Sequence, residues 1–201
     1  MTTTAALLPA VPGWSEARRR LFETAIVLFG ERGVHGVSVR DLMGELGQQP
    51  GALYGHVASK QQLLYELVRL GYEEHHRWVR EALLSSGSDP VEQVRALVHA
   101  HVMAHLTYPA LAKVTTREAR ALDAQQLEEL NGILHDSERI FLDVFERGQR
   151  LGVFHVEEPT LALAAIAAMG VRAAERYTPD MRFSPEDLAT TYAGYAVKIL
   201  T

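Results

Sequence analysis

Histidines and carboxylates at helical spacing are the residues of this chain that could bind a metal ion or transfer protons. Glu73 and His76 have the Glu-x-x-His spacing of di-iron helical bundles, and His101 and His105 lie one helical turn apart. A di-iron bundle needs a second Glu-x-x-His motif, and none is present in the sequence. Val102 stands where the zinc-binding motif His-Glu-x-x-His has its glutamate. The spacing of these residues therefore predicts no metal site.

Other catalytic motifs are missing as well. The chain contains no cysteine, which excludes disulfides, thiolate zinc sites and cysteine nucleophiles. The sequence also has no Gly-rich phosphate-binding loop and no nucleophile elbow. We therefore expect a protein that is not an enzyme and that needs no cofactor.

A run of polar and small residues near the N-terminus has the pattern of a nucleic-acid contact. Residues 39–56 predict a helix, a tight turn at Gly47 and Gln48, and a second short helix that opens with Gln49 and Pro50. Such a helix-turn-helix places its second helix in the major groove of DNA. Leu53 and Val57 face inward in this arrangement, which leaves the following residues for solvent or DNA: Gln48, Gln49, Gly51, Ala52, Tyr54, Gly55 and His56.

Cationic side chains flank this run. Lys60 begins the next predicted helix, whose exposed N–H groups favour an anion, so Lys60 is a candidate phosphate contact. Arg18 in the preceding helix is a second candidate, and Ser38 with Arg40 a third. Gly51 and Gly55 weaken a short helix by about 1 kcal/mol each relative to alanine, which makes sense where backbone must approach a partner closely.

The elements that must position these residues are all helices. Serine and aspartate caps stand before several apolar stripes, two of them followed by proline at the first helical position, and no Asn-Gly or Asp-Gly hairpin signal competes with them. We expect an all-α fold of about nine helices. Their predicted ranges are 15–32, 39–46, 49–56, 59–84, 90–107, 109–121, 123–150, 159–177 and 185–200.

Composition sets the domain organisation. The 201 residues are 47% hydrophobic, enough to bury a sizeable core, and the longest apolar run, residues 161–171, is about half the length of a membrane span. The net charge is −5, yet residues 1–60 carry six Lys or Arg against five acidic residues, so the acidic excess lies elsewhere. We expect a disordered tail over 1–13, a DNA-binding domain over 14–60, a second domain over 61–201, and a cytoplasmic protein.

The run from Leu21 to Leu64, and above all Ala52-Leu53-Tyr54-x-His56 followed by Ser59-Lys60, closely resembles the DNA-binding domain of the TetR family of transcriptional repressors. The resemblance implies that Gln49, Pro50, Gly51, Ala52, Tyr54 and His56 occupy recognition-helix positions. It also implies that Lys60 contacts a phosphate and that Tyr54 lies along the DNA backbone.

The C-terminal half resembles TetR-family regulators of fatty-acid, acyl-CoA or sterol catabolism, through Arg117 to Leu122, Gly152-Val153-Phe154 and Ser184 to Leu188. The resemblance implies a small apolar or acyl-type effector. Polar and aromatic groups in otherwise apolar stripes suit its pocket. The candidates are Trp78, His101, His105, Tyr108, Arg117, Arg120, Phe141 and Arg172.

Small residues crowd the last two predicted helices, 159–177 and 185–200, and permit close helix approach. Because a helix-turn-helix protein reads palindromic DNA through a two-fold axis, we expect these helices to form a homodimer interface. Two functions remain open at this point. One is a ligand-responsive repressor bound to operator DNA, and the other is an all-helical carrier or enzyme that binds an apolar molecule without touching DNA.

Overall fold

The computed structural model describes residues 6–178 and 180–201, and every regular element in this part of the chain is a helix. The elements follow one another as α1 (Glu16–Arg32), η1 (Val34–Gly36), α2 (Val39–Glu45), η2 (Pro50–Gly55), α3 (Lys60–Ser85), α4 (Pro90–Thr107), α5 (Pro109–Glu118), η3 (Ala119–Ala121), α6 (Ala124–Arg150), α7 (Pro159–Arg176) and α8 (Pro185–Leu200). The symbol η marks a 3-10 helix. The predicted all-α fold is confirmed.

Two predicted helices differ in kind from the expectation. The segment expected as a helix over 49–56 is the 3-10 helix η2, because Pro50 and two glycines disfavour a continued α-helix there. The α-helix expected over 109–121 ends at Glu118, and its last turn tightens into η3. Such tightening is common at helix ends, where carbonyl groups have no partner one full turn ahead.

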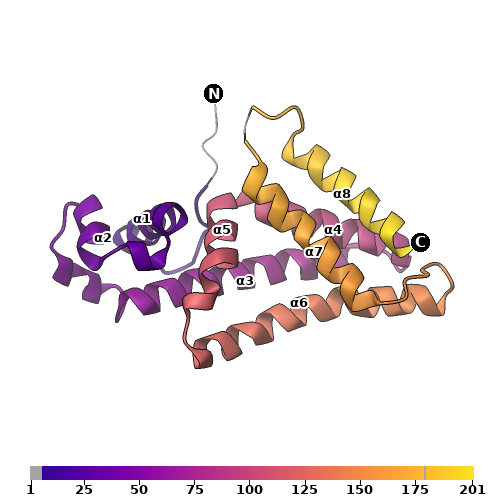
Figure 1. Cartoon of the computed structure of the whole chain (residues 1–201), viewed down its shortest axis with the longest axis horizontal. Coiled ribbons are helices and arrows are strands. Elements are labelled where there is room, and N and C mark those ends of the chain that lie inside the picture. Colours follow the sequence, from indigo (N-terminus) through magenta and orange to yellow (C-terminus); the bar gives the residue numbers. More distant parts are fainter. Residues whose placement is uncertain (1–5, 179) are drawn as a thin grey trace. The chain divides into compact units, whose positions relative to one another are not determined.

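The chain divides into two compact units. The first contains the described residues up to Tyr72 together with Tyr108–Leu130, and the second contains Glu73–Thr107 and Asn131–Thr201. Both α3 and α6 contribute residues to each unit (Figure 1). The first unit thus also contains the first turns of α3 and the whole of α5. The division into a DNA-binding domain over 14–60 and a second domain over 61–201 stays a prediction.

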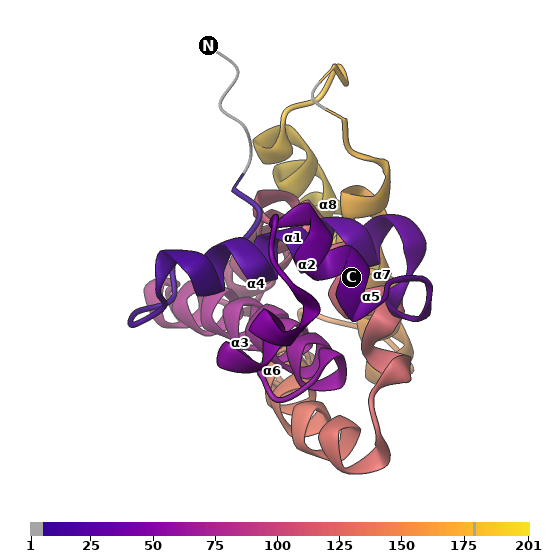
Figure 2. The same ribbon diagram turned by 90° about the vertical axis from the view of Figure 1, so that its left-hand side faces the viewer.

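The first unit is built on α1. Its N-cap Ser15 accepts a hydrogen bond from the Arg18 amide at 3.2 Å, and the helix ends at Gly33, whose φ of 71° suits glycine. The apolar stripe expected from the sequence is buried and packs against α2 and α5. Figure 2 turns this unit toward the viewer, with α1 and α2 in front.

Residues 1–13 were expected to be a disordered tail, of which residues 1–5 lie outside the described part of the chain. In the described part, Leu8 is 1% exposed, and the Arg19 guanidinium donates hydrogen bonds to the carbonyl oxygens of Leu8 and Pro9 at 3.0 and 3.2 Å. The sequence contained no periodic signal for this contact, because a single leucine anchors it.

The second unit has a core between α4, α6, α7 and α8. Both α7 and α8 pack against α4 (Figure 1). Phe145, Phe154 and Ile166 are fully or almost fully buried there. Proline stands at the start of α4, α7 and α8, and Ser184 with Asp187 forms a complete capping box on α8, as the sequence predicted. No helix in the described residues is long and apolar enough to cross a membrane.

Candidate functional site

The helix-turn-helix of the first unit is formed by α2, the turn at Gly47 and η2. Ser38 caps α2: its hydroxyl oxygen accepts a hydrogen bond from the Asp41 amide at 3.1 Å, and Asp41 Oδ2 accepts one from the Ser38 amide at 2.8 Å. The hydrogen bond from the Ser38 hydroxyl is the main cause that holds the pKa of Asp41 below its usual value. Gly47 has a φ of 66°, and the amide of Gln48 then bonds to the Met43 carbonyl at 2.9 Å.

One face of η2 is apolar and buried, and the other is polar and exposed. Leu53 has no exposed surface, and neither have Leu42 and Met43 of α2, the helix against which η2 packs, while Tyr54 beside Leu53 is 65% exposed. Exposed residues on the same run are Gln48, Gln49, Gly51, Tyr54 and Gly55, and half-buried ones are Pro50, Ala52 and His56. The structure therefore brings the expected recognition residues together on η2 and on the residues that directly flank it.

Two residues expected at DNA phosphates, Arg18 and Lys60, have their charged groups engaged within the first unit in the absence of DNA, and their phosphate contacts stay a prediction. The Arg18 guanidinium donates hydrogen bonds to the His56 carbonyl and to the Glu66 carboxylate, and it lies over the rings of Trp14 and Phe22. The Lys60 ammonium donates to the carbonyl oxygens of Val34 at 2.8 Å and Val37 at 2.6 Å.

The spacing of residues along the sequence does not predict these contacts, because residues 18, 34 and 37 are far from 56, 60 and 66 in sequence. Arg18 ties α1 to the end of η2, and Lys60 ties the start of α3 to the turn before α2. Both act as braces of the helix-turn-helix in the protein by itself. Ser38 and Arg40 remain exposed at the N-terminus of α2.

The residues expected to line the effector pocket fall into both units. Tyr108, Arg117 and Arg120 belong to the first unit, where both arginines are exposed. The remaining five belong to the second: Trp78, His101, His105, Phe141 and Arg172. Of these, the structure places His101 and His105 in contact with each other and His101 edge-on to Phe141, at a ring-centroid distance of 6.3 Å.

Trp78 and Arg172 lie outside that group of contacts. The Trp78 indole N–H donates to Glu74 Oε1 at 2.8 Å, one turn back on the same helix. Arg172 is exposed on α7 and pairs with Glu175 at 2.7 Å. An exposed ion pair between residues three apart on one helix is solvated, so it contributes little to the free energy of unfolding.

A third histidine completes the group, which we call the histidine cluster: His75, His101 and His105. His75 Nε2 lies 2.8 Å from His101 Nδ1, His101 Nε2 lies 3.0 Å from the Ala167 carbonyl oxygen, and His105 Nδ1 lies 2.8 Å from the His101 carbonyl oxygen. His75 was not predicted, because only its neighbour His76 has the Glu-x-x-His spacing, and His76 Nδ1 lies 3.0 Å from the Ser137 hydroxyl oxygen.

His101 is buried and His75 and His105 are half-buried, and this environment favours their neutral forms. Burial is the main cause that lowers the pKa of His75 to about 3 and the pKa of His101 well below its usual value, and burial also lowers the pKa of His105. Neutral imidazole is the form that offers a nitrogen lone pair to a partner. The fold therefore places three such donors inside the second unit.

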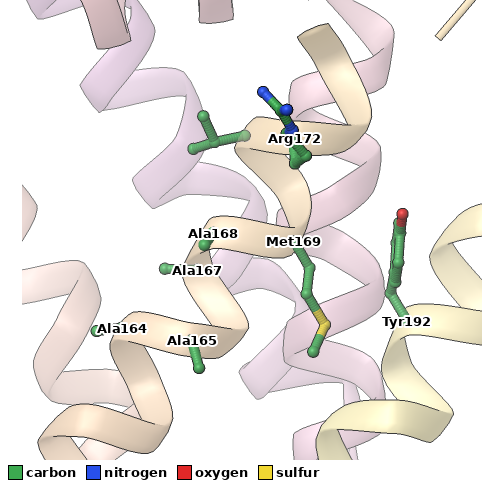
Figure 3. Close-up of a pocket in the computed structure, with 8 residues that line it drawn as sticks. Ala164, Ala165, Ala167, Ala168, Met169, Arg172 and Tyr192 are labelled. Carbon is green, nitrogen blue, oxygen red and sulfur yellow. The ribbon is translucent and has the colours of Figure 1, made fainter. Parts of the chain in front are cut away.

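An open apolar hollow of about 640 Å³ lies on the outer side of α7, beside Tyr192 of α8. Figure 3 shows that Met169 and Tyr192 come from different helices to the same side of this hollow, with Arg172 further along α7. Leu161 and Tyr195, one from each of these helices, are 68% and 50% exposed. The small residues of α7 thus lie on a surface as well as in the core.

Comparison with known proteins gives matches along almost the whole chain. Residues 21–67 match the family model described as bacterial regulatory proteins, tetR family, and residues 87–200 match the model for the tetracyclin repressor-like C-terminal domain. The HTH-type transcriptional repressor KstR2 of Mycobacterium tuberculosis is 30% identical over 149 residues, which cover 72% of each chain.

Solved structures show the same fold. The ketosteroid transcriptional regulator KstR2 of M. tuberculosis superposes with a TM-score of 0.86 at 23% identity, covering 98% of this chain and 99% of that one. AibR, in complex with isovaleryl coenzyme A and operator DNA, superposes with a TM-score of 0.80 at 20% identity, covering 90% of this chain and 97% of AibR.

Proposed function

Because this chain belongs to the TetR family of bacterial transcriptional regulators, we propose that it is a repressor that binds a palindromic operator as a homodimer and releases it when a small effector occupies the second unit. We place it in the cytoplasm, where the operator is, and assign it no catalytic activity. The observation that carries the proposal is the exposed polar face of η2, supported from behind by Leu53.

The face of η2 suits the major groove for two reasons. Gln48 and Gln49 offer amide groups that can both donate and accept at base edges, and Tyr54 projects a hydroxyl that can reach a phosphate. A Cβ atom added at Gly51 or Gly55 would meet no atom of the chain within 4 Å. This part of the helix therefore has room for DNA to approach its backbone.

The proposal is tested by an electrophoretic mobility shift with DNA from the intergenic region next to the gene, titrated with salt. We expect specific binding that weakens steeply as salt rises, because phosphate contacts release counterions. No shift at low salt would contradict the repressor. It would favour the alternative function, a carrier that binds an apolar molecule and does not bind DNA.

Substitutions on η2 locate the contact. Gln49→Ala and Tyr54→Ala should each weaken operator binding by about 1–3 kcal/mol, the cost of a lost base or backbone contact. Gln125→Ala, an exposed glutamine at the start of α6, is the matched control and should bind like the wild type. Equal affinity of all three variants would remove η2 from the interface.

The dimer is proposed to form through the outer faces of α7 and α8. The exposed Leu161, Tyr195 and Ile199 and the alanines that line the hollow give an apolar surface on two neighbouring helices, as a four-helix seam between two copies requires. Leu161→Arg should produce monomers in sedimentation velocity. Leu84→Arg, at a leucine that is 72% exposed on α3, should leave the dimer intact. A dimer in both variants would refute this seam.

A small apolar or acyl-type effector is proposed because of what two relatives are named for: a ketosteroid regulator, and a regulator solved with isovaleryl coenzyme A. Binding to the folded state alone at 100 times Kd would stabilise the protein by about 2.7 kcal/mol. We expect thermal stabilisation and loss of operator binding with isovaleryl coenzyme A or a ketosteroid, and neither with free coenzyme A. Operator binding unchanged by all of them would reject this effector class.

Release is proposed to follow a shift in population. The effector would favour a spacing of the two η2 elements in the dimer that no longer matches successive major grooves. The spacing can be measured between spin labels attached at an exposed position of α2 in each protomer. An identical distance distribution with effector and with operator would refute this mechanism.

A further inference from the structure

Three imidazole rings from two helices meet inside the second unit. One ring nitrogen from each of His75, His101 and His105 lies within 4.8 Å of the others. The rings of His101 and His105 have centroids 4.5 Å apart, and those of His75 and His101 are 5.0 Å apart in an edge-to-face arrangement. Three histidines that converge in this way are a common donor set for zinc and related ions.

The hydrogen bonds determine which nitrogens carry lone pairs. The Ala167 carbonyl can only accept, so His101 Nε2 is the donor and His101 Nδ1 carries the lone pair. By the same reasoning His105 donates from Nδ1 to the His101 carbonyl, and its lone pair is on Nε2. His75 Nε2 must then donate to His101 Nδ1.

We propose that the histidine cluster binds one divalent transition-metal ion, with Zn²⁺ as the best-suited ion, through His75 Nε2, His101 Nδ1 and His105 Nε2. A water molecule would fill the fourth position of a tetrahedral site. This inference goes beyond the proposed repressor function and does not depend on it. It also differs from the prediction of no metal site, which rested on local spacing motifs that could not include His75.

The outer contacts of the cluster match those of known metal-binding histidines. Such histidines almost always donate the N–H that faces away from the metal to a carbonyl, a carboxylate or water, which holds the ring in place. His101 and His105 already do so through the carbonyl groups of Ala167 and His101, at 3.0 and 2.8 Å. Two of the three ligands are thus oriented before any ion binds.

Gly170 makes this orientation possible. A Cβ atom at position 170 would lie 2.4 Å from His101 Nε2, so only glycine lets α7 approach the ring closely enough for the Ala167 carbonyl to accept its hydrogen bond. Phe141 of α6 lies edge-on to the His101 ring. Side chains or backbone from α6 and α7 therefore pack against this histidine of α4.

The distances fit a zinc ion after a small adjustment. Tetrahedral Zn²⁺ with Zn–N bonds of about 2.0–2.1 Å needs ligand nitrogens roughly 3.3 Å apart. The His75 Nε2 to His101 Nδ1 distance is 2.8 Å, and one ring nitrogen of each histidine lies within 4.8 Å of the others. The ion would take the place of the proton between His75 and His101.

Binding of the ion would release no net proton from the three histidines. His101 and His105 would use lone pairs that they already carry, and His75 would move its proton from Nε2 to Nδ1 through exchange with water. All three imidazoles stay neutral, and the charge of the complex is the charge of the ion. No oxidant, reductant or other reactant is needed.

The test measures Zn²⁺ binding to the full, tag-free chain after treatment with a chelator, by competition with a chromophoric chelator and without DNA. We expect one Zn²⁺ per chain at submicromolar concentration. Co²⁺ should give the intense visible absorption of a tetrahedral complex. Absence of stoichiometric Zn²⁺ binding, or a weak octahedral Co²⁺ spectrum, would overturn the proposal.

Substitutions of single histidines test whether the ion binds at the histidine cluster. His75→Gln and His105→Gln should each weaken Zn²⁺ binding at least about 100-fold, since the loss of an outer partner alone costs 10–100-fold. His135→Gln, at an exposed histidine on α6, is the matched control and should bind like the wild type. Circular dichroism checks that each variant is folded. Zn²⁺ affinity that is equal in all three folded variants would overturn the site.

Because this experiment contains no DNA, its outcome is independent of operator binding. Zn²⁺ binding without a DNA shift would support the proposed metal site and contradict the proposed repressor function. A DNA shift without Zn²⁺ binding would support the repressor function and overturn the metal site.

Discussion

Replacing Lys60 with methionine removes an ammonium group while keeping most of the apolar stem of the side chain. In the structure this ammonium donates two hydrogen bonds, to the Val34 carbonyl at 2.8 Å and the Val37 carbonyl at 2.6 Å. Both valines are almost fully buried, at 2% and 1% exposure, so water has limited access to their carbonyl groups. The substitution therefore removes a charged donor from both carbonyl groups, although the Val34 carbonyl keeps a long hydrogen bond from the Val37 amide at 3.4 Å.

The expected loss can be estimated from these contacts. A hydrogen bond to a charged group contributes about 1.5–3 kcal/mol, and because one partly exposed ammonium serves both carbonyls, we expect a total of about 2–4 kcal/mol. Urea denaturation, followed by circular dichroism and by tryptophan fluorescence, to which Trp14 in the first unit and Trp78 in the second contribute, measures this change in the free energy of unfolding. Lys113→Met, on α5 of the same unit, is the control and should change stability by less than about 1 kcal/mol.

The same variant separates a brace from a phosphate contact. If Lys60 mainly contacts a phosphate, Lys60→Met would leave the free energy of unfolding unchanged and would lower the salt dependence of operator binding by about one counterion. That pair of results would refute the reasoning from the structure. A large loss of stability with an unchanged salt slope in the remaining folded protein would support it.

Four further substitutions test other parts of the fold. Gly170→Ala should lower the free energy of unfolding by about 1–3 kcal/mol in denaturant titration, because its Cβ would overlap His101, and wild-type stability would contradict the packing of α7. Ser38→Ala and Ser184→Ala should each lower the free energy of unfolding by about 1 kcal/mol through a lost helix cap. In gel shifts of folded protein, only Ser38→Ala should weaken operator binding. Equal effects of the two variants on operator binding would argue against a contact between α2 and DNA. Gly55→Ala should leave thermal stability unchanged or raised, since its Cβ meets nothing within 4 Å, and should weaken operator binding measured by gel shift; unchanged affinity would show that DNA does not approach there.

Helix positions were predictable from the sequence because their signals are local. A cap at Ser38 or Ser184 acts on an amide three residues away, and the apolar stripe of α1 repeats within a single helix. The kind of helix at η2 was not predicted, since the choice between an α-helix and a 3-10 helix there depends on how Leu53 docks onto α2 as well as on Pro50 and the glycines.

The same distinction between local and long-range contacts applies to the candidate site. The exposed face of η2 follows from the inward position of Leu53, which the pattern of residues 48–57 shows by itself. The roles of charged residues do not follow in that way, because a cation bonds to whichever acceptor the fold brings within reach. Arg18 and Lys60 donate to carbonyl groups contributed by segments more than twenty residues away, contacts that the sequence did not predict, while their expected contact with DNA stays a prediction.

The sequence by itself therefore determined the helices, the family and the polar face that is proposed to meet DNA, all of which rest on short-range periodicity and on a motif within one segment. Only the tertiary structure decided the partners of Arg18 and Lys60 and the meeting of His75 with His101 and His105. The physical reason is that imidazole and ammonium groups act at about 3 Å, a distance between residues distant in sequence that only the packing of whole helices can set.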